Sequence, residues 1–424
     1  MSWPPRLSTR LLAGLVVVAL LLVAAALALG RDGEPSGKTI VTVRLWDPSV
    51  AAAYAESFAE FSRSHPGIEV RTNVVPYASY FTTLRTDVAG GGADDIFWLN
   101  NANFAEYADN HRLMAVEPDV DWDPSVVAQF TRGGTSWGVP QLTDAGIAVY
   151  YNADLLAADG VDPAELDSVR WDPDPAVDTL RPLLKRLTHG RQWGYNAAND
   201  LQAIYLNYIG SAGGEFSDGD RFAFDNPQAA GAFRYVVGLI NTDRVAPPAS
   251  DTNDNGDFSR NQFLSGRMAL FQSGTYNLAQ VAEQARFRWG VAMLPSGPAG
   301  RVSVTNGIVA AGNPATRHPD AVRQVLDWLG SARGNEYVGR RGAAIPAVLP
   351  AQRAYFDYWS AKGVDVTPFF RVLDGPRIPA PGGPGFAAGY QAIKPYFDEM
   401  FLGRLPVDRA LAAAQRAANA AAAR

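Results

Sequence analysis

Cysteine is entirely absent from this chain of 424 residues. Disulfides, thiolate zinc sites and cysteine nucleophiles are therefore excluded. Histidine is also scarce, and its occurrences are scattered along the chain at His65, His111, His189 and His318. Their spacing matches neither a metal site nor a pairing of nucleophile and base. The sequence therefore predicts no metal site, and we expect no cofactor.

Charged residues make up only 19% of the chain, below the roughly 25% of an average soluble domain. The formal net charge is -6 and no basic stripe is present, so nucleic acid is not an expected partner. Asp94 and Asp95 are adjacent on an expected strand, so their carboxylates point to opposite faces. A glycosidase needs two carboxylates flanking one bond, so we expect no enzyme.

An apolar run from Leu11 to Leu29 follows Arg6 and Arg10 near the N-terminus. Basic residues before such a run place the N-terminus in the cytoplasm and the rest of the chain outside. Its length exceeds the ~7–15 residues of a cleavable signal core and approaches the ~20 that span a bilayer. We predict that residues 11–29 tether the protein to the outer face of the cell membrane. Secretion after signal cleavage is the alternative, because an Ala-Leu-Ala cleavage pattern ends the run.

Strand patterns alternate with helical patterns after residue 38. Strands are expected at 39–46, 68–75 and 95–99, with helices at 51–64, 77–89 and 104–110. This alternation predicts a mostly parallel sheet wrapped in helices. Later helices are expected at 172–187, 204–210, 227–241, 261–265, 319–331, 350–359, 389–401 and 408–423, and strands at 266–272, 288–293 and 302–311.

The segment from Trp137 to Leu156 is the most informative part of the chain. It contains a short strand ending at Pro140, a polar link, an apolar strand and a helix that begins at Asn152. A polar link between two apolar strands is where a chain would pass from one lobe to another. We therefore expect Asp144, inside this link, to face a cleft. A similar polar break at Thr305-Asn306-Gly307 predicts a second crossing, with Asn306 as a candidate contact.

Aromatic and polar side chains follow two of the expected strands. Trp46 and Asp47 follow the first strand, and Trp98, Asn100 and Asn101 end the third. Ligands of open α/β sheets bind beyond the carboxyl ends of the strands. Indole rings offer a face for a sugar ring, while carboxylates and amides bind hydroxyl groups. A helix cap beside a packed tryptophan and a structural turn are the alternatives for these two groups.

Several short motifs occur along the chain in a particular order. They include GVP and TD at 138–144, YYN at 150–152, DNPQAAGAF at 225–233 and FLSGRMALFQSGTY at 263–276. Their order and spacing extend from Val41 to about Ala418. This succession resembles the sugar-binding group of the extracellular solute-binding proteins of ABC importers, the group that contains maltose-binding protein.

The resemblance implies an α/β fold of the two-lobed, periplasmic-binding-protein type. Each lobe would be a mostly parallel sheet flanked by helices, and a hinge would join the lobes. The expected divisions are a signal or anchor segment with linker at 1–38, lobe one at 39–144 and 306–344, and lobe two at 145–305 and 345–424. Many members from Gram-positive bacteria carry an acylated cysteine as a membrane anchor, which this chain lacks.

The resemblance also implies ligand contacts. In the family, an aromatic residue at the position of Tyr276 stacks on the ligand, and a carboxylate at Asp144 accepts a hydrogen bond. Second-lobe contacts come from the loop that contains Tyr195, Asp200 and Gln202, although the acidic-aromatic pair of maltose binders is missing from it.

Two further segments are open to alternative interpretations. Phe386 follows a Gly/Pro-rich loop and is a candidate wall of the pocket. Asp251 to Gly256 resembles the start of a calcium loop, but its twelfth position is Gln262 instead of the bidentate glutamate. We therefore expect a surface turn there and no metal.

The implied function is that of the substrate-binding component of an ABC importer. It would capture a carbohydrate outside the cell membrane by hinge closure and deliver it to the membrane permease subunits, and we expect a monomer. The alternative is an extracytoplasmic ligand-sensing module of a signalling system. The missing anchor cysteine and the long apolar segment keep that alternative open.

Overall fold

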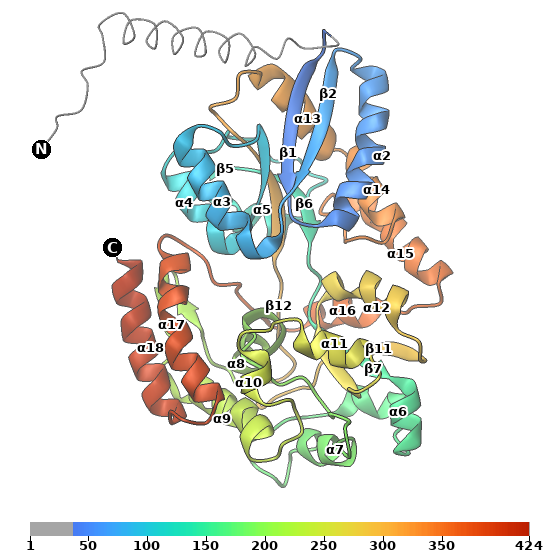
Figure 1. Ribbon diagram of the computed structural model, residues 1–424, viewed down its shortest axis with the longest axis vertical. Helices are drawn as coiled ribbons and strands as arrows, with labels where there is room; N and C mark the ends of the chain where they lie inside the picture. The colour runs from blue at the N-terminus through green and yellow to red at the C-terminus, as the bar shows by residue number, and fades with distance from the viewer. Residues whose placement is uncertain (1–36, 424) are drawn as a thin grey trace, which may run out of the picture.

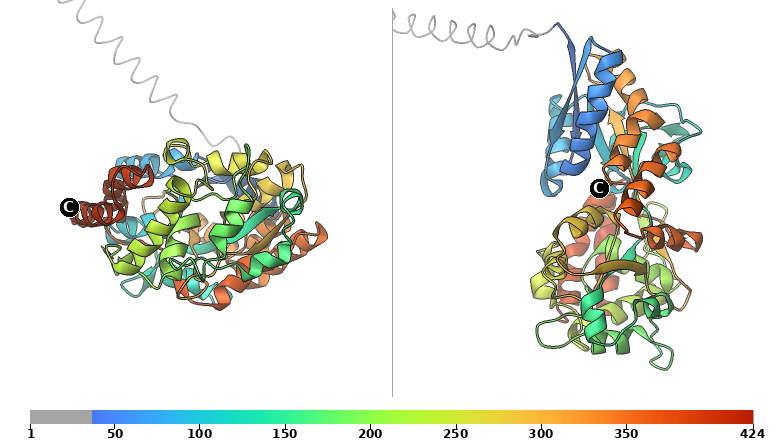
Figure 2. Two further views of the ribbon diagram at one scale, coloured as in Figure 1. Left: turned by 90° about the horizontal axis from the view of Figure 1, so that it is seen from below. Right: turned by 90° about the vertical axis from the view of Figure 1, so that its right-hand side faces the viewer.

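The computed structural model describes residues 37–423, which form two lobes stacked along the long axis (Figure 1). The predicted signal or anchor segment lies outside the described residues. Within residues 37–423, no helix combines the length and apolar character that a membrane crossing requires. Figure 2 shows the same two lobes from the side, with the chain passing between them at a narrow waist.

Lobe one is built on a five-stranded mixed sheet with the order β2-β1-β3-β13-β6. Its strands are β1 (Thr39–Leu45), β2 (Ile68–Val74), β3 (Ile96–Asn100), β13 (Gly307–Gly312) and β6 (Val139–Thr143). β1 pairs in parallel with β2 and β3, whereas β13 runs antiparallel to β3 and β6. The last two strands therefore come from the two expected crossing segments and meet at the edge of this sheet.

The first helix of lobe one, α2 (Pro48–Ser64), follows directly from its sequence. Asp47 caps its N-terminus by accepting hydrogen bonds from the backbone of the first turn, and Pro48 occupies the first helical position. Tyr54, Phe58 and Phe61 recur at helical spacing and are buried against the sheet. The other helices of this lobe are α3 (Tyr77–Gly90), α4 (Asn101–Asp109), α5 (Pro124–Gln129), α13 (Pro319–Leu329) and α14 (Ala332–Arg340).

Lobe two has a smaller sheet and more helix. Its main sheet has the order β10-β7-β11, formed by β7 (Ala148–Asn152), β10 (Leu270–Ser273) and β11 (Trp289–Met293). Both pairings are antiparallel, so the expectation of a mostly parallel sheet is wrong for this lobe. A buried strand has the same apolar pattern in either direction, so its sequence does not reveal its polarity. The two-lobed α/β architecture itself is confirmed.

Helices form the outer layer of lobe two. They include α6 (Ala153–Ala158), α7 (Leu180–Arg186), α8 (Leu206–Ser211), α9 (Pro227–Asn241) and α12 (Leu278–Gln284), and the C-terminal pair α17 (Phe386–Phe401) and α18 (Val407–Ala422). α17 and α18 lie side by side along one edge (Figure 1). Buried alanines at 410, 414 and 418 let the two helices approach closely.

One predicted helix is mostly absent. The expected helix at 172–187 is reduced to α7, because the segment before it folds into successive turns. Asp172 accepts a hydrogen bond from the N–H of Asp174, which in turn accepts one from the N–H of Ala176. Such side-chain bonds to the local backbone compete with helix formation.

The stretch of chain that follows Ala344 contacts both lobes. Ala347 donates its N–H to the Gln141 carbonyl at 3.0 Å, and Ala351 belongs to the core of lobe one. α15 (Gln352–Ala361) then packs on α14, whereas α16 (Thr367–Arg371) packs on β11. Tyr355 and Trp359 of α15 nevertheless belong to the same core cluster as Tyr150 of lobe two, so the boundary at residue 345 stays a prediction.

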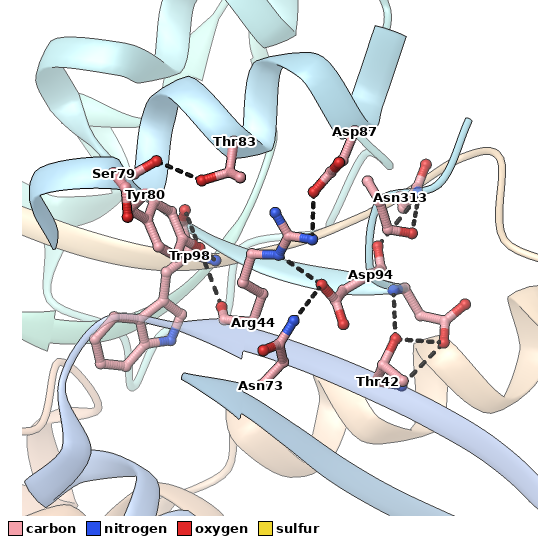
Figure 3. Close-up of polar contacts among 12 residues, drawn as sticks. Thr42, Arg44, Asn73, Ser79, Tyr80, Thr83, Asp87, Asp94, Trp98 and Asn313 are labelled. Carbon is pink, nitrogen blue, oxygen red and sulfur yellow. Dashed lines mark hydrogen bonds and ion pairs between the residues drawn. The ribbon is translucent and has the colours of Figure 1, made fainter. Parts of the chain in front are cut away.

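A cluster of polar side chains centred on the buried Arg44 lies between the sheet of lobe one and α3 (Figure 3). The Arg44 guanidinium pairs with Asp94 at 2.5 Å and with Asp87 at 2.7 Å, and Asn73 donates to Asp94 at 3.2 Å. Asp95 turns away from this cluster and accepts from Thr42 at 2.9 Å. The two adjacent aspartates therefore serve opposite sides, as their alternation predicts, and both hold lobe one together.

Tyr80 on α3 joins β1 to β3 where their direct pairing ends (Figure 3). Its hydroxyl accepts the N–H of Trp98 at 2.9 Å and lies 3.1 Å from the Arg44 carbonyl and 3.0 Å from the Trp98 carbonyl. The Tyr80 side chain is fully buried. It therefore sets the separation of the strand ends that lead into Trp46 and Asn100.

Tyr80→Phe is expected to lower the free energy of unfolding by about 1–3 kcal/mol, because it strands buried backbone groups without a hydrogen-bond partner. Urea unfolding followed by tryptophan fluorescence measures the change. Tyr358→Phe is the matched control, since that partly exposed tyrosine contacts Lys362 only through its ring. Equal stabilities of the two variants would show that the Tyr80 hydroxyl does not hold the strands together.

Candidate functional site

A cavity of about 860 Å³ lies between the lobes. Tyr77 and Phe81 of α3 and Asn103 of α4 line it on lobe one. Phe386 and Tyr390 of α17 line it on lobe two. The carboxyl ends of β2 and β3 lead into α3 and α4, which carry this wall, as expected for an open α/β sheet.

Aromatic rings form the lobe-one wall around Trp46. The half-buried indole of Trp46 lies 5.5 Å from the Tyr77 ring, 4.9 Å from Tyr80, 5.7 Å from Phe81 and 5.0 Å from Trp98, measured between centroids. These near-perpendicular and tilted contacts hold the indole in one orientation. Trp46 can therefore present a fixed edge toward the cleft.

Trp98 does not reach the cleft, which corrects the prediction that it contacts a ligand. Its side chain is fully buried behind Trp46, and its indole N–H donates to the Tyr54 hydroxyl at 3.3 Å. Every residue of β3 is buried, so alternation along this strand does not indicate which side chain faces the cleft. Trp98 supports the wall instead of forming its surface.

Tyr77 is the cleft residue that the sequence analysis missed on lobe one. It is 57% exposed, which is unusual for a large aromatic side chain. Its hydroxyl accepts a hydrogen bond from Asn100 at 3.3 Å. Its position in the sequence could have identified it. Tyr77 comes two residues after the expected strand 68–75, just as Trp46 and Asn100 lie at the ends of the first and third expected strands.

The side-chain amides of Asn100 and Asn101, at the end of β3, already make hydrogen bonds within the protein. Asn100 is buried, donating to Tyr77 and accepting from Asn103 at 2.9 Å. Asn101 donates to the Ala380 carbonyl of lobe two at 2.9 Å, so it bridges the lobes. Both side chains therefore position the cleft walls in this structure.

Asp47 caps a helix and could also contact a ligand, which are the two roles that the sequence left open. Its Oδ1 accepts from the N–H of Ser49 at 2.7 Å and of Val50 at 3.1 Å. No hydrogen bond of the described residues uses its Oδ2. Burial raises the pKa of Asp47, and the two backbone N–H groups oppose that rise. The cap leaves one carboxylate oxygen free to accept from a ligand.

Asp144 lies where the chain passes between the lobes. Its N–H donates to the Asn306 carbonyl at 2.7 Å, and the Thr305 hydroxyl donates to the Asp144 carbonyl at 2.6 Å. Its carboxylate accepts from Gln202 of lobe two at 2.9 Å. Burial raises the pKa of Asp144 to about 6, against the opposing effect of the Gln202 hydrogen bond. The Asn306 side chain accepts from the N–H of Gly307 at 3.0 Å, which stabilises the turn.

Tyr276 of lobe two lines a separate, smaller cavity and is 46% exposed. Its ring lies directly over Gly274, where a Cβ atom would come within 2.3 Å of the ring. Only glycine therefore allows this ring position. Burial of the hydroxyl, followed by the charges of Asp200 and Asp144, raises the pKa of Tyr276. The two carboxylates therefore lie close to this ring.

The loop before α8 supplies one exposed carboxylate. Asp200 accepts the N–H of Ala203 at 2.8 Å through Oδ1 and caps the π-helical turn Leu201–Tyr205. Asp200 therefore caps a helical turn and remains exposed beside Tyr276.

The structure also corrects the prediction that Tyr195 contacts a ligand. Its side chain is fully buried and its hydroxyl donates to Gln272 on β10, so it supports the floor of lobe two and does not face the cleft. Phe386 is only 5% exposed and stacks on Phe222 and Tyr390, although it lines the cavity between the lobes. It belongs mainly to the core of lobe two.

The structure therefore brings one set of residues toward a common space at the hinge. Burial of the hydroxyl is the main cause that raises the pKa of Tyr77, Tyr276 and Tyr355, and the charge of Asp144 contributes to each rise, which indicates that this carboxylate lies near tyrosines of both lobes. Tyr390 lines the cavity and is a further residue that the sequence analysis missed, whereas Tyr355 is buried in the core. Their positions depend on packing between distant segments, so no local motif marks them.

The cations near this space are already paired. Arg85 lines the cavity and pairs with Glu106 at 3.1 Å. Lys394 pairs with Asp398 at 2.6 Å and with Asp254 at 3.1 Å. The site therefore offers aromatic faces, amides and carboxylates, which suit a neutral ligand with hydroxyl donors better than an anion.

The segment with the calcium-like pattern forms two short helices, α10 (Ala249–Thr252) and α11 (Phe258–Leu264), with a turn between them. Asp254 in this turn pairs with Lys394. Within the described part of the chain, no group of three or more His, Cys, Asp and Glu side chains could hold a metal ion.

Residues 47–336 match the family model described as bacterial extracellular solute-binding protein. A crystal structure of UspC from M. tuberculosis is 71% identical in sequence, covers 90% of this chain and 100% of the other, and superposes with a TM-score of 0.76. A binding protein of Brucella abortus (strain 2308) is 24% identical, over 97% of this chain and 97% of its own length.

Similarity in fold extends to more distant proteins. An ABC substrate-binding protein from Listeria monocytogenes, solved in complex with cycloalternan, is 19% identical. It covers 90% of this chain and 98% of its own, with a TM-score of 0.78. At this identity the likeness concerns the fold alone.

The raised pKa of Asp144 predicts a specific dependence of stability on pH. The folded state holds the Asp144 proton up to about pH 6, whereas the ordinary value is 3.8. Between these values the folded state binds more protons, so the contribution of Asp144 to stability falls as pH rises from about 4 to 6. The Asp144→Asn variant is expected to lack this decrease in stability with rising pH. It should therefore be more stable than the wild type at pH 7.

Thermal unfolding at pH 4, 5, 6 and 7 measures the difference between wild type and Asp144→Asn. Asp225→Asn, which removes one negative charge from an exposed position of lobe two, controls for the change in net charge. Parallel curves for wild type and Asp144→Asn would contradict the raised pKa.

Proposed function

Because the chain belongs to the bacterial extracellular solute-binding protein family, we propose that it captures a carbohydrate outside the cell membrane for an ABC importer. Proteins of this family bind a solute and catalyse no reaction on it. The single observation that carries the proposal is the pair of exposed tyrosines, Tyr77 on lobe one and Tyr276 on lobe two, beside Asp144.

A sugar ring fits this chemistry. Its C–H faces pack on aromatic rings, and its hydroxyl groups donate to carboxylates and exchange hydrogen bonds with amides. Tyr77 and Tyr276 supply the rings, and Asp47, Asp144 and Asp200 supply acceptors. The Listeria protein with cycloalternan shares only the fold, so the carbohydrate proposal depends on the residues of this cleft.

Capture would proceed by hinge closure. Ligand contacts on both lobes stabilise the closed state over the open state, because only the closed state makes both sets of contacts. The crossings at Asp144 and Thr305 are short and bonded to each other, so rotation there would move each lobe as a unit. The closed form would then be the one that the permease subunits recognise.

The proposed setting is the outer face of the cell membrane. Tethering through residues 11–29, or secretion after cleavage, remains a prediction from the sequence. The protein is proposed to act as a monomer that meets the permease subunits of its importer.

Tyr276→Ala and Tyr77→Ala are each expected to weaken the affinity for the bound sugar by about 1–3 kcal/mol, the scale of losing an aromatic contact at a binding site. A thermal-shift screen across monosaccharides and oligosaccharides identifies the sugar, and isothermal titration calorimetry measures the affinities. Tyr358→Ala, a tyrosine on α15, is the control. Wild-type affinity in both test variants would remove the tyrosines from the site.

Uptake of the labelled sugar by a deletion strain tests the transport role. Loss of uptake, restored by the wild-type gene but not by Tyr276→Ala, is the expected result. Normal uptake together with a lost transcriptional response to the sugar would instead support a sensing module.

A further inference from the structure

A Gly/Pro-rich loop connects β14 (Arg377–Ile378) to α17 of lobe two and passes close to lobe one. We call this loop, residues 379–385, the strap. The Asn101 side chain at the start of α4 donates to the Ala380 carbonyl of the strap at 2.9 Å. A Cβ atom on Gly382 would lie 2.7 Å from the Asn101 side-chain nitrogen and 2.8 Å from its carbonyl oxygen. The strap therefore contacts lobe one through two of its residues.

An ion pair joins the lobes beside the strap. Asp220, in the turn that follows β8 (Ser217–Asp218) on lobe two, lies 3.8 Å from the Arg132 guanidinium of lobe one. A Cβ atom on Gly383 would lie 2.3 Å from the Asp220 carboxylate, so this turn contacts the strap. Arg132 also donates to Asp109 at the end of α4 at 2.9 Å, which holds the guanidinium at the edge of lobe one.

An apolar contact accompanies these polar contacts. Ala102 of α4 packs against the buried core cluster of lobe two, to which Phe386 belongs. α4 and α17 accordingly pack on each other between the two lobes (Figure 1). All of these contacts join one protein group to another, so none of them needs a solute in order to form.

The sequence of the strap fits this close approach. Gly383 and Gly385 have φ values of +104° and +71°, a backbone region that favours glycine. A side chain at Gly382 would meet the Asn101 backbone, and a side chain at Gly383 would meet Asp220. Glycine at these positions therefore allows the strap to lie between the two lobes.

We propose that the strap, Asn101 and the ion pair of Arg132 with Asp220 form a latch that favours the closed arrangement of the lobes before a solute binds. This inference rests on the proposed function, because it assumes that the lobes close about the hinge. A larger closed fraction before binding increases the apparent affinity for the solute, since the binding-competent state is more populated.

The latch is expected to depend on ionic strength. The side chains of Arg132 and Asp220 are 32% and 56% exposed, so their attraction is modest and is screened by salt. Raising the salt concentration to about 1 M should therefore increase the open fraction of the wild type. The Asp220→Asn variant lacks this ion pair and should respond less.

Distances between two spin labels test the latch without any solute. The chain has no cysteine, so Thr86→Cys on α3 and Arg416→Cys on α18 place labels at exposed positions of the two lobes. Double electron–electron resonance then measures the distribution of lobe separations. Asp220→Asn is expected to lower the ratio of closed to open molecules about 2–5-fold, the scale of one exposed ion pair. Gly382→Ala, which forces the strap away from Asn101, should lower it by more than about 5-fold.

Two variants serve as matched controls and should keep the wild-type distances. Asp218→Asn removes the same charge from an exposed position of the same hairpin. Gly67→Ala adds a methyl group at a position where, beyond its chain neighbours, no described residue comes within 4 Å.

Wild-type distance distributions in both Asp220→Asn and Gly382→Ala would overturn the latch and leave the proposed function standing. A response to salt that is equal in wild type and Asp220→Asn would overturn the role of the ion pair. The expected shifts in distance, together with a wild type that binds none of the screened sugars, would support the latch and count against carbohydrate capture.

Discussion

The pairing of two crossing segments at the waist is the constraint on which the rest of the structure depends. The N–H of Asp144 bonds to the Asn306 carbonyl, and the N–H of Ile147 bonds to the Ser303 hydroxyl at 2.7 Å. Gly146 brings in the third crossing through its N–H, which bonds to the Phe369 carbonyl at 2.7 Å. A Cβ atom at Gly146 would lie 2.0 Å from Val372, so only glycine permits this approach. Three separate passages of the chain therefore meet at one point.

This arrangement gives the cleft two walls that belong to separately packed lobes. Each lobe has its own buried core, and Tyr80 holds the strand ends of lobe one at a set distance. In the proposed hinge closure, Asp144 would lie near the pivot, so its distance from either wall would change least. Such a carboxylate would hold the solute in both the open and the closed state, whereas Tyr77 and Tyr276 would contact it together only on closure.

The rule that ligands bind beyond the carboxyl ends of the strands identified some of the candidate site residues and missed others. Trp46 and Asn100 were predicted because each stands at the end of an expected strand, and Tyr77 satisfies the same rule after the second strand. Trp98 was placed wrongly because β3 is buried on both faces, which removes the alternation that would assign its side chain. Tyr195 was placed wrongly because its partner, Gln272, lies far away in the sequence.

The sequence by itself determined the alternation of strands and helices, the polar crossings at Asp144 and Thr305, and the resemblance to a solute-binding family, since these depend on local pattern and motif order. Only the tertiary structure decided the antiparallel sheet of lobe two and the burial of Trp98 and Tyr195 inside their lobes. These features arise from contacts between segments that are distant in the chain. Packing between these segments decides such contacts. The apolar pattern of a strand is the same whichever strand it pairs with, so the pattern does not identify the partner.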